Sequence, residues 1–125
     1  MKANEIMIGD WVIDGKNIAQ IASITCDGII ETTFNKSSNI EVIEPIPLTP
    51  EILEKNGLEK DNHGRLFGEY FDEDINRDLE ITVDSKTGEV WWSYNWDEYW
   101  IIRLRYVHQL QHALRLCGIE KEIIL

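Results

Sequence analysis

The sequence LEITVDSKTGEVWWSY, residues 79–94, alternates apolar and polar side chains on both sides of a short turn. The apolar positions are Leu79, Ile81 and Val83 before the turn and Val90, Trp92 and Tyr94 after it. The turn, DSKTG at residues 84–88, ends in a glycine that suits a left-handed backbone conformation. Together these features predict an antiparallel β-hairpin with one apolar face.

The same alternation continues on both sides of this hairpin. In residues 66–71, Leu66 and Tyr70 fall on one face, whereas Phe67, Glu69 and Phe71 fall on the other. Residues 100–105 alternate in the same way, so residues 66–105 are expected to form a four-stranded antiparallel meander.

A C-terminal helix is expected to pack on this sheet. Between residues 106 and 117, apolar side chains recur at spacings of three and four, and Gly118 provides a stop. The expected core stripe is Val107, Leu110, Ala113, Leu114 and Cys117, and the expected outward residues are His108, Gln111, His112 and Arg115. Residues 120–125 are expected to return as a final strand.

Residues 1–44 are expected to form a small N-terminal SH3-like β unit. Four β-rich runs are separated by turn signals, at residues 6–13, 18–25, 29–34 and 40–43. Residues 45–125 then contain a stiff proline connector and a short helix, with Thr49 as N-cap and Pro50 in the first turn. The prediction is thus one α+β domain over residues 1–125.

Composition excludes several classes of protein. The 125 residues carry 23 acidic and 12 basic side chains, a formal net charge of −11, which argues against direct binding to nucleic acid or to an anionic membrane. No signal-peptide pattern or membrane-length apolar run is present, so we expect a cytoplasmic protein. Cys26 and Cys117 lack a metal or redox spacing, and two free, buried thiols are expected, although a disulfide stays open.

Two motifs resemble those of a protein family. PIPLTPEIL with the following NG (residues 45–57) and YVHQLQ (residues 106–111), together with IGDWV (residues 8–12), resemble a family of small proteins in Bacteroidota genomes, prophages and mobile elements. The resemblance implies a bacterial cytoplasm under phage influence, and it carries over no catalytic residue.

Candidate catalytic and metal sites are weak. His108 and His112 are four residues apart, but no third ligand accompanies them, so exposed surface histidines are expected. The acidic segment at residues 72–80 lacks the glycine and the final glutamate of a calcium-binding loop and is expected to join two strands. Cys117 would lie at a helix C-terminus, where the helix dipole disfavours a thiolate. We therefore expect no catalytic residue, no metal and no cofactor.

The segment from Trp91 to Trp100 is the most unusual feature, because it holds four of the five tryptophans. Alternation sends Trp92, Tyr94, Trp96 and Trp100 to the core and leaves Trp91 and Tyr99 on the other face, near Arg103 and Arg105. Aromatic and arginine side chains on an exposed sheet face are typical of binding interfaces. The same face could instead be a second buried layer.

These features predict a non-enzymatic protein-interaction module, with Trp91, Tyr99, Arg103 and Arg105 as its binding residues and an unidentified protein partner. In a sharper version, the acidic chain occupies the nucleic-acid groove of a host defence protein, although the same charge also suits solubility. The alternative is a small-molecule or nucleotide binder on the same face. A homo-oligomer is compatible with either hypothesis.

Overall fold

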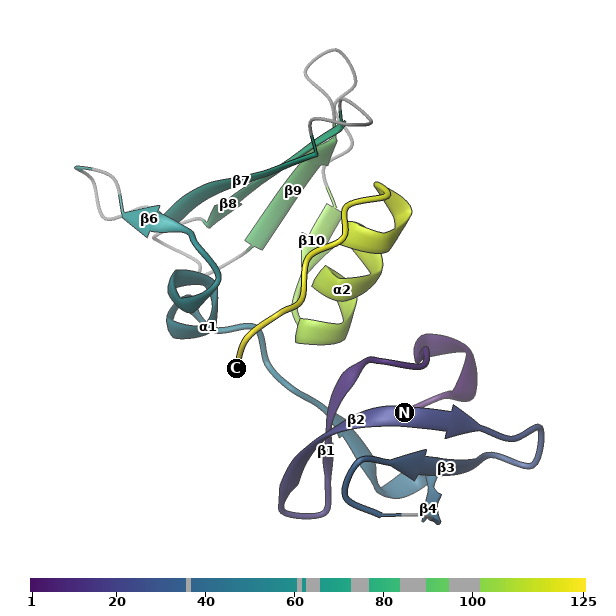
Figure 1. Cartoon of the computed structure of the whole chain (residues 1–125). Coiled ribbons are helices and arrows are strands. Elements are labelled where there is room, and N and C mark those ends of the chain that lie inside the picture. The colour runs from purple at the N-terminus through teal and green to yellow at the C-terminus, as the bar shows by residue number, and fades with distance from the viewer. Residues whose placement is uncertain (36, 61, 63–65, 73–76, 84–89, 95–101) are drawn as a thin grey trace. The chain divides into compact units, whose positions relative to one another are not determined.

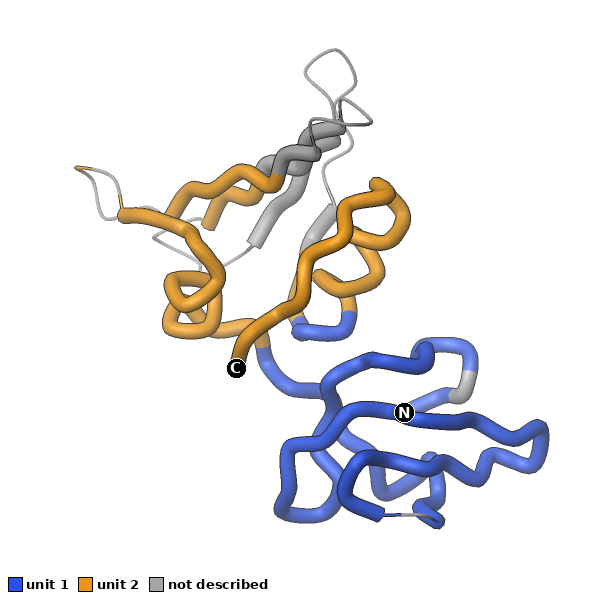
Figure 2. Tube along the Cα trace, in the orientation of Figure 1, with its two compact units in different colours: residues 1–47, 106–108 blue, residues 48–105, 109–125 orange. Residues whose placement is uncertain are grey.

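The computed structural model describes residues 1–35, 37–60, 62, 66–72, 77–83, 90–94 and 102–125. It confirms the expected α+β fold class, with antiparallel sheets and a C-terminal helix. The chain forms two compact units, coloured separately in Figure 2. The first comprises residues 1–47 and 106–108, and the second comprises residues 48–105 and 109–125.

The first unit contains one five-stranded antiparallel sheet with strand order β4-β3-β2-β1-β5. Its elements are η1 (Ala3–Glu5), β1 (Trp11–Asp14), β2 (Asn17–Ile24), β3 (Ile29–Thr32), β4 (Ser38–Asn39), η2 (Ile40–Val42) and β5 (Ile43–Pro45). A register shift between Ile21 and Ser23 lies in β2, the strand that pairs with both β1 and β3. Such a bulge bends a strand, so β2 can serve both halves of a curled sheet. The last strand, β5, follows the 3-10 turn η2 and pairs with the first strand, β1.

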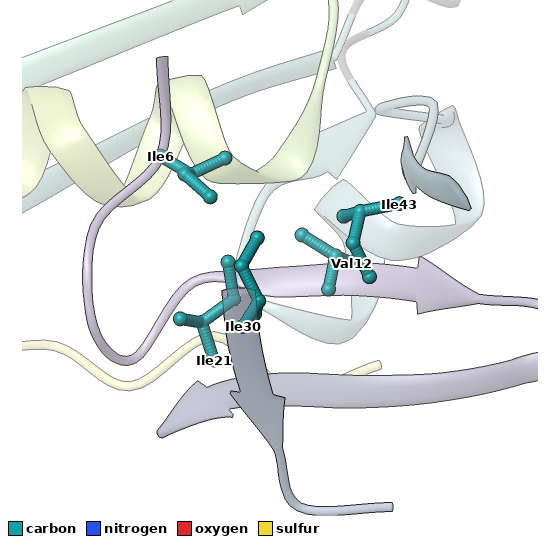
Figure 3. Packing of buried hydrophobic residues seen from close by; sticks show 5 residues of the cluster. All are labelled: Ile6, Val12, Ile21, Ile30 and Ile43. Atoms are coloured by element: carbon teal, nitrogen blue, oxygen red, sulfur yellow. The ribbon is translucent and has the colours of Figure 1, made fainter. Parts of the chain in front are cut away.

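The core of this unit contains isoleucines and a valine from β1, β2, β3, β5 and the segment before β1. Ile6, Val12, Ile21, Ile30 and Ile43 converge, as Figure 3 shows, and each is at most 6% exposed. The strand expected at residues 40–43 is wrong over most of its length, because Ile40–Val42 form the 3-10 turn η2. The Asn39 side chain caps this turn by accepting a hydrogen bond from the Glu41 amide (3.0 Å).

The second unit contains a five-stranded antiparallel sheet with strand order β10-β9-β8-β7-β6. Its strands are β6 (Glu59–Lys60), β7 (Leu66–Asp72), β8 (Arg77–Val83), β9 (Val90–Tyr94) and β10 (Ile102–Leu104). The expected meander of four strands is present, and the short strand β6 extends it at the β7 edge.

Helix α1 (Pro50–Lys55) begins and ends as its sequence predicts. The Thr49 hydroxyl accepts a hydrogen bond from the Ile52 amide (3.3 Å). At the other end, Gly57 has a positive φ of 100°, and the Leu58 amide donates to the Leu53 carbonyl (3.1 Å). This is a Schellman C-cap, which a residue without a Cβ adopts at little cost.

Helix α2 (Val107–Leu116) is more deeply buried than its sequence predicts. Of its ten residues, only Arg115 and Leu116 are exposed. His108, expected to point outward, is 5% exposed, and Gln111 is buried as well. None of the helices among the described residues has the length and apolar character needed to cross a bilayer.

The C-terminal segment does not form the strand expected at residues 120–125. Instead, the backbone of Ile124 pairs with the side-chain amide of Asn56, which accepts from the Ile124 amide and donates to its carbonyl (2.7 Å each). The side-chain amide of Asn56 thus makes the hydrogen bonds to the Ile124 N–H and C=O that a neighbouring strand would make in a sheet.

Candidate functional site

One row of residues crosses the second sheet from edge to edge. Strand pairing places Glu59 of β6 opposite Phe67 of β7, Phe67 opposite Thr82 of β8, Thr82 opposite Trp91 of β9, and Trp91 opposite Arg103 of β10. We call these five positions the cross-sheet row. Directly opposed residues of an antiparallel pair belong to the same face of the sheet, so the five positions share one face.

This face is open to solvent wherever its side chains are described. Glu59, Phe67, Glu69 and Thr82 are all exposed, and Phe67 keeps 45% of its surface in contact with water. Other large apolar side chains of the described residues are exposed as well, such as Phe34 at 63%, so Phe67 matters here for its place in the row and not for its exposure alone. The described side chains of this face are therefore uncovered.

The opposite face of the same sheet is covered. Figure 1 shows α1, α2 and the C-terminal segment on one side of β7–β10. Gly68 follows Phe67 in β7 and therefore faces the opposite side of the sheet. It lies so close to Leu58 that an added Cβ would be 2.6 Å from the Leu58 Cγ. Tyr70 is buried on this side, and its hydroxyl donates to the Asn56 carbonyl (2.8 Å). The sheet thus has one covered and one open face, as antiparallel sheets often do.

The open face is acidic at its β6–β7 end. Glu59 lies opposite Phe67, and Glu69 follows Phe67 by two residues on the same strand. Position 80, the strand partner of Glu69, is also a glutamate. Lys60 is the cation next to Glu59 in the chain, and its ammonium group is 3.3 Å from the carboxylate of Glu54. Carboxylates therefore border Phe67 across the strands and along its own strand.

The four predicted binding residues are only partly brought together. Trp91 and Arg103 are direct strand partners in β9 and β10. Arg105 is exposed one residue beyond β10, where its amide donates to the Gln109 side chain (2.7 Å) and its carbonyl accepts from Leu48 (2.9 Å). Tyr99 lies outside the described residues. The sequence analysis did not name Phe67 as a binding residue, although strand pairing connects it to Trp91 through Thr82. The alternation in residues 66–71 was the signal that could have identified it.

The helical histidines do not form a metal site. His108 is buried, contrary to the exposed position expected, and its ring stacks on Tyr106 with centroids 5.8 Å apart and planes 12° apart. His112 is half-buried. Within the described ranges, no cluster of three or more His, Cys, Asp or Glu side chains could hold a metal ion.

The cysteines are both free thiols, but only one is buried. Cys117 lies in the core of the second unit, at 3% exposure, as expected. Cys26 is exposed in the turn between β2 and β3, which corrects the prediction of two buried thiols. The acidic segment at residues 72–80 was expected to be a loop, but Asp72 is the last residue of β7 and residues 77–80 belong to β8; residues 73–76 lie outside the described part.

Two buried aspartates of the first unit were also missed, and both have structural partners. Asp10 accepts a hydrogen bond from the Met7 amide (2.7 Å) and closes the tight turn that contains Gly9, whose φ is +93°. Asp14 accepts from the Thr32 hydroxyl (2.9 Å) and the Ser38 hydroxyl (2.8 Å), which connects β1 to β3 and β4. Each carboxylate holds strands and turns together, because a buried charge needs such donors.

The buried Tyr70, on the covered face of the second sheet, is a titratable group with a shifted pKa. Burial raises the pKa of Tyr70 to about 12. The Lys121 ammonium lies 5.6 Å from the centre of its ring, within the range of a cation–π contact. The hydroxyl donates to a backbone carbonyl, so this tyrosine has a structural function in the core.

Comparison with known proteins gives no assignment: no family model, no curated protein and no solved structure matches this chain. What the open face can bind is therefore inferred from its own residues. Aromatic groups, a hydroxyl and charges of both signs on one face of a sheet can bind a protein surface.

Proposed function

We propose that this protein is a non-enzymatic interaction module that binds a protein partner through the open face of its second sheet. The observation that carries the proposal is the cross-sheet row, in which an exposed phenylalanine shares one face with a tryptophan and an arginine. Phenylalanine, tryptophan and arginine are enriched in protein interfaces, and tryptophan and arginine dominate their binding energy.

The shape of the surface supports a protein partner. Thr82 lies between Phe67 and Trp91 in the row, so one strand, β8, separates the two aromatic positions. Neighbouring strands are about 4.8 Å apart, so the row spans about 19 Å over five strands. That length suits a protein–protein interface of ordinary size, about 800 Å² on each side.

Site-specific photo-crosslinking tests the proposal. The photoreactive amino acid p-benzoylphenylalanine replaces Thr82 at the centre of the row and, in a control protein, Leu116, which is 79% exposed on α2. Each protein is irradiated in a lysate of a Bacteroidota bacterium, and the crosslinked species are identified by mass spectrometry. We expect a defined protein adduct from position 82 that position 116 does not give.

The row residues are then tested by substitution. Adding Phe67→Ala, or Trp91→Ala with Arg103→Ala, to the protein labelled at position 82 should abolish the adduct, whereas Leu116→Ala should leave it intact. Equal adducts from positions 82 and 116, or an adduct that survives both row variants, would contradict the proposal. A thermal shift with one nucleotide, lost in the Trp91→Ala protein, would support the small-molecule alternative instead.

A further inference from the structure

We infer that the partner of this face is a cationic protein surface, one that places lysine or arginine side chains around an apolar group. The inference rests on the proposed function and names the chemistry of its partner. It comes from the β6–β7 end of the open face, where an exposed aromatic ring is bordered by carboxylates.

The geometry around Phe67 defines what the partner must present. Glu59 is the direct strand partner of Phe67, at a distance of about 5 Å between side-chain origins, and Glu69 is two residues along β7, about 7 Å away. When an apolar group of the partner covers the exposed Phe67 ring, the partner residues next to that group lie over the carboxylates of Glu59 and Glu69. Cations at those points gain charge-assisted hydrogen bonds, whereas anions are repelled.

A like-charge pair strengthens the preference for cations. Glu69 lies directly opposite Glu80, and like charges at directly opposed positions destabilise an antiparallel pair. Strand register thus places a second glutamate position directly beside Glu69 on this face. The nearby Lys60 is engaged with Glu54 at 3.3 Å.

The charge along the row is also polarised. The carboxylates lie at the β6–β7 end, and Arg103 lies at the β10 end, four strands away from Glu59. The net charge of −11 on the whole chain adds long-range attraction for a basic partner. These charges favour a partner that places its basic part over β6 and β7.

Binding of two defined peptides to the full chain tests this inference. The first probe repeats Lys-Ser-Leu-Ser three times, so that lysine and leucine share one face of an extended strand, and the second has glutamate in place of lysine. Fluorescence anisotropy is measured at 20 mM and 300 mM NaCl. We expect the lysine peptide to bind, to weaken at the higher salt concentration, and to outcompete the glutamate peptide.

Two double variants with the same change of charge locate the effect. Glu59→Gln with Glu69→Gln removes the carboxylates beside Phe67, and Glu120→Gln with Glu122→Gln removes two exposed carboxylates of the C-terminal segment. The first should weaken binding of the lysine peptide about tenfold, as expected for the loss of two exposed ion pairs, and the second should change it less than twofold. Circular dichroism checks that both variants remain folded.

Three outcomes would overturn the inference: no binding of the lysine peptide at low salt, equal binding of the glutamate peptide, or equal weakening by the two double variants. The photo-adduct at position 82 separates this failure from failure of the proposed function. An adduct that Phe67→Ala abolishes but Glu59→Gln with Glu69→Gln preserves would leave the interaction module standing and refute the cationic partner. An adduct that survives both row variants and also Glu59→Gln with Glu69→Gln would refute the interaction module and the cationic partner.

Discussion

Asn56→Ala removes three side-chain hydrogen bonds from the second unit. The Asn56 side chain donates to the carbonyls of Ile52 and Ile124 and accepts from the amide of Ile124, each at 2.7 Å, and the residue is 1% exposed. Each bond contributes about 1 kcal/mol to stability, and water can regain part of the loss at Ile124, which is exposed. We expect the free energy of unfolding to fall by about 2–3 kcal/mol.

Urea denaturation followed by tryptophan fluorescence measures this loss. Four of the five tryptophans lie within residues 91–100, so the signal reports mainly on the second unit. With a denaturant dependence of about 2 kcal/mol per molar urea, the midpoint should fall by about 1–1.5 M. Asn62→Ala, at an exposed asparagine of the same unit, is the matched control and should leave the midpoint unchanged.

Truncation of the chain after Glu122 tests the assignment of the lost bonds. This deletion removes Ile124, so Asn56→Ala in the shortened chain should cost only the bond to Ile52, about 1 kcal/mol. If Asn56→Ala shifts the midpoint by less than about 0.3 M in the full chain, or costs as much in the shortened chain, the argument that Asn56 holds the C-terminal segment is refuted.

Three further predictions concern other buried groups of the chain. Tyr70→Phe should lower the free energy of unfolding by about 1 kcal/mol, because it removes the 2.8 Å hydrogen bond to the Asn56 carbonyl. Burial raises the pKa of Tyr70 to about 12, above the value of about 10 in the unfolded chain, so wild-type stability should be intact below pH 10 and fall between pH 10 and 12. In urea titrations over that pH interval, the Tyr70→Phe protein should lose less stability than the wild type. Gly68→Ala should lower the free energy of unfolding by about 1–3 kcal/mol, because the added Cβ overlaps Leu58. In thermal unfolding, the Gly68→Ala/Leu58→Ala double variant should lose less stability than the two single variants combined, and strict additivity would rule out the clash. A thiol reagent should label Cys26 of the native protein within minutes and Cys117 only after denaturation, and rapid labelling of a Cys26→Ser variant would contradict the burial of Cys117.

The local elements could be predicted because their signals lie within a few residues of one another. Thr49 and Gly57 mark the two ends of α1, and alternation of side chains marks the strands of the second sheet. The candidate site could be predicted in part for the same reason, since alternation separates Trp91 from Trp92. Which strand lies beside which, and so the link from Trp91 through Thr82 to Phe67, depends on pairing between segments that the sequence does not specify.

The errors occur where a residue's environment comes from distant parts of the chain. His108 and Gln111 read as outward residues because helical periodicity identifies one buried stripe, and α2 is buried around most of its surface. Ile40–Val42 read as a strand because isoleucine and valine favour strands, and the Asn39 cap stabilises a 3-10 turn there instead.

The sequence by itself determined the α+β class, the order of the elements, the capped helix α1 and the alternation that gives the second sheet two different faces, because these depend on backbone preferences and on side-chain periods of two and 3.6 residues. Only the tertiary structure decided which face stays open, how Phe67, Trp91 and Arg103 line up, and how Asn56 holds Ile124, 68 residues further along the chain. The physical reason is that burial and strand register are properties of contacts between distant segments, and a local pattern permits several such arrangements.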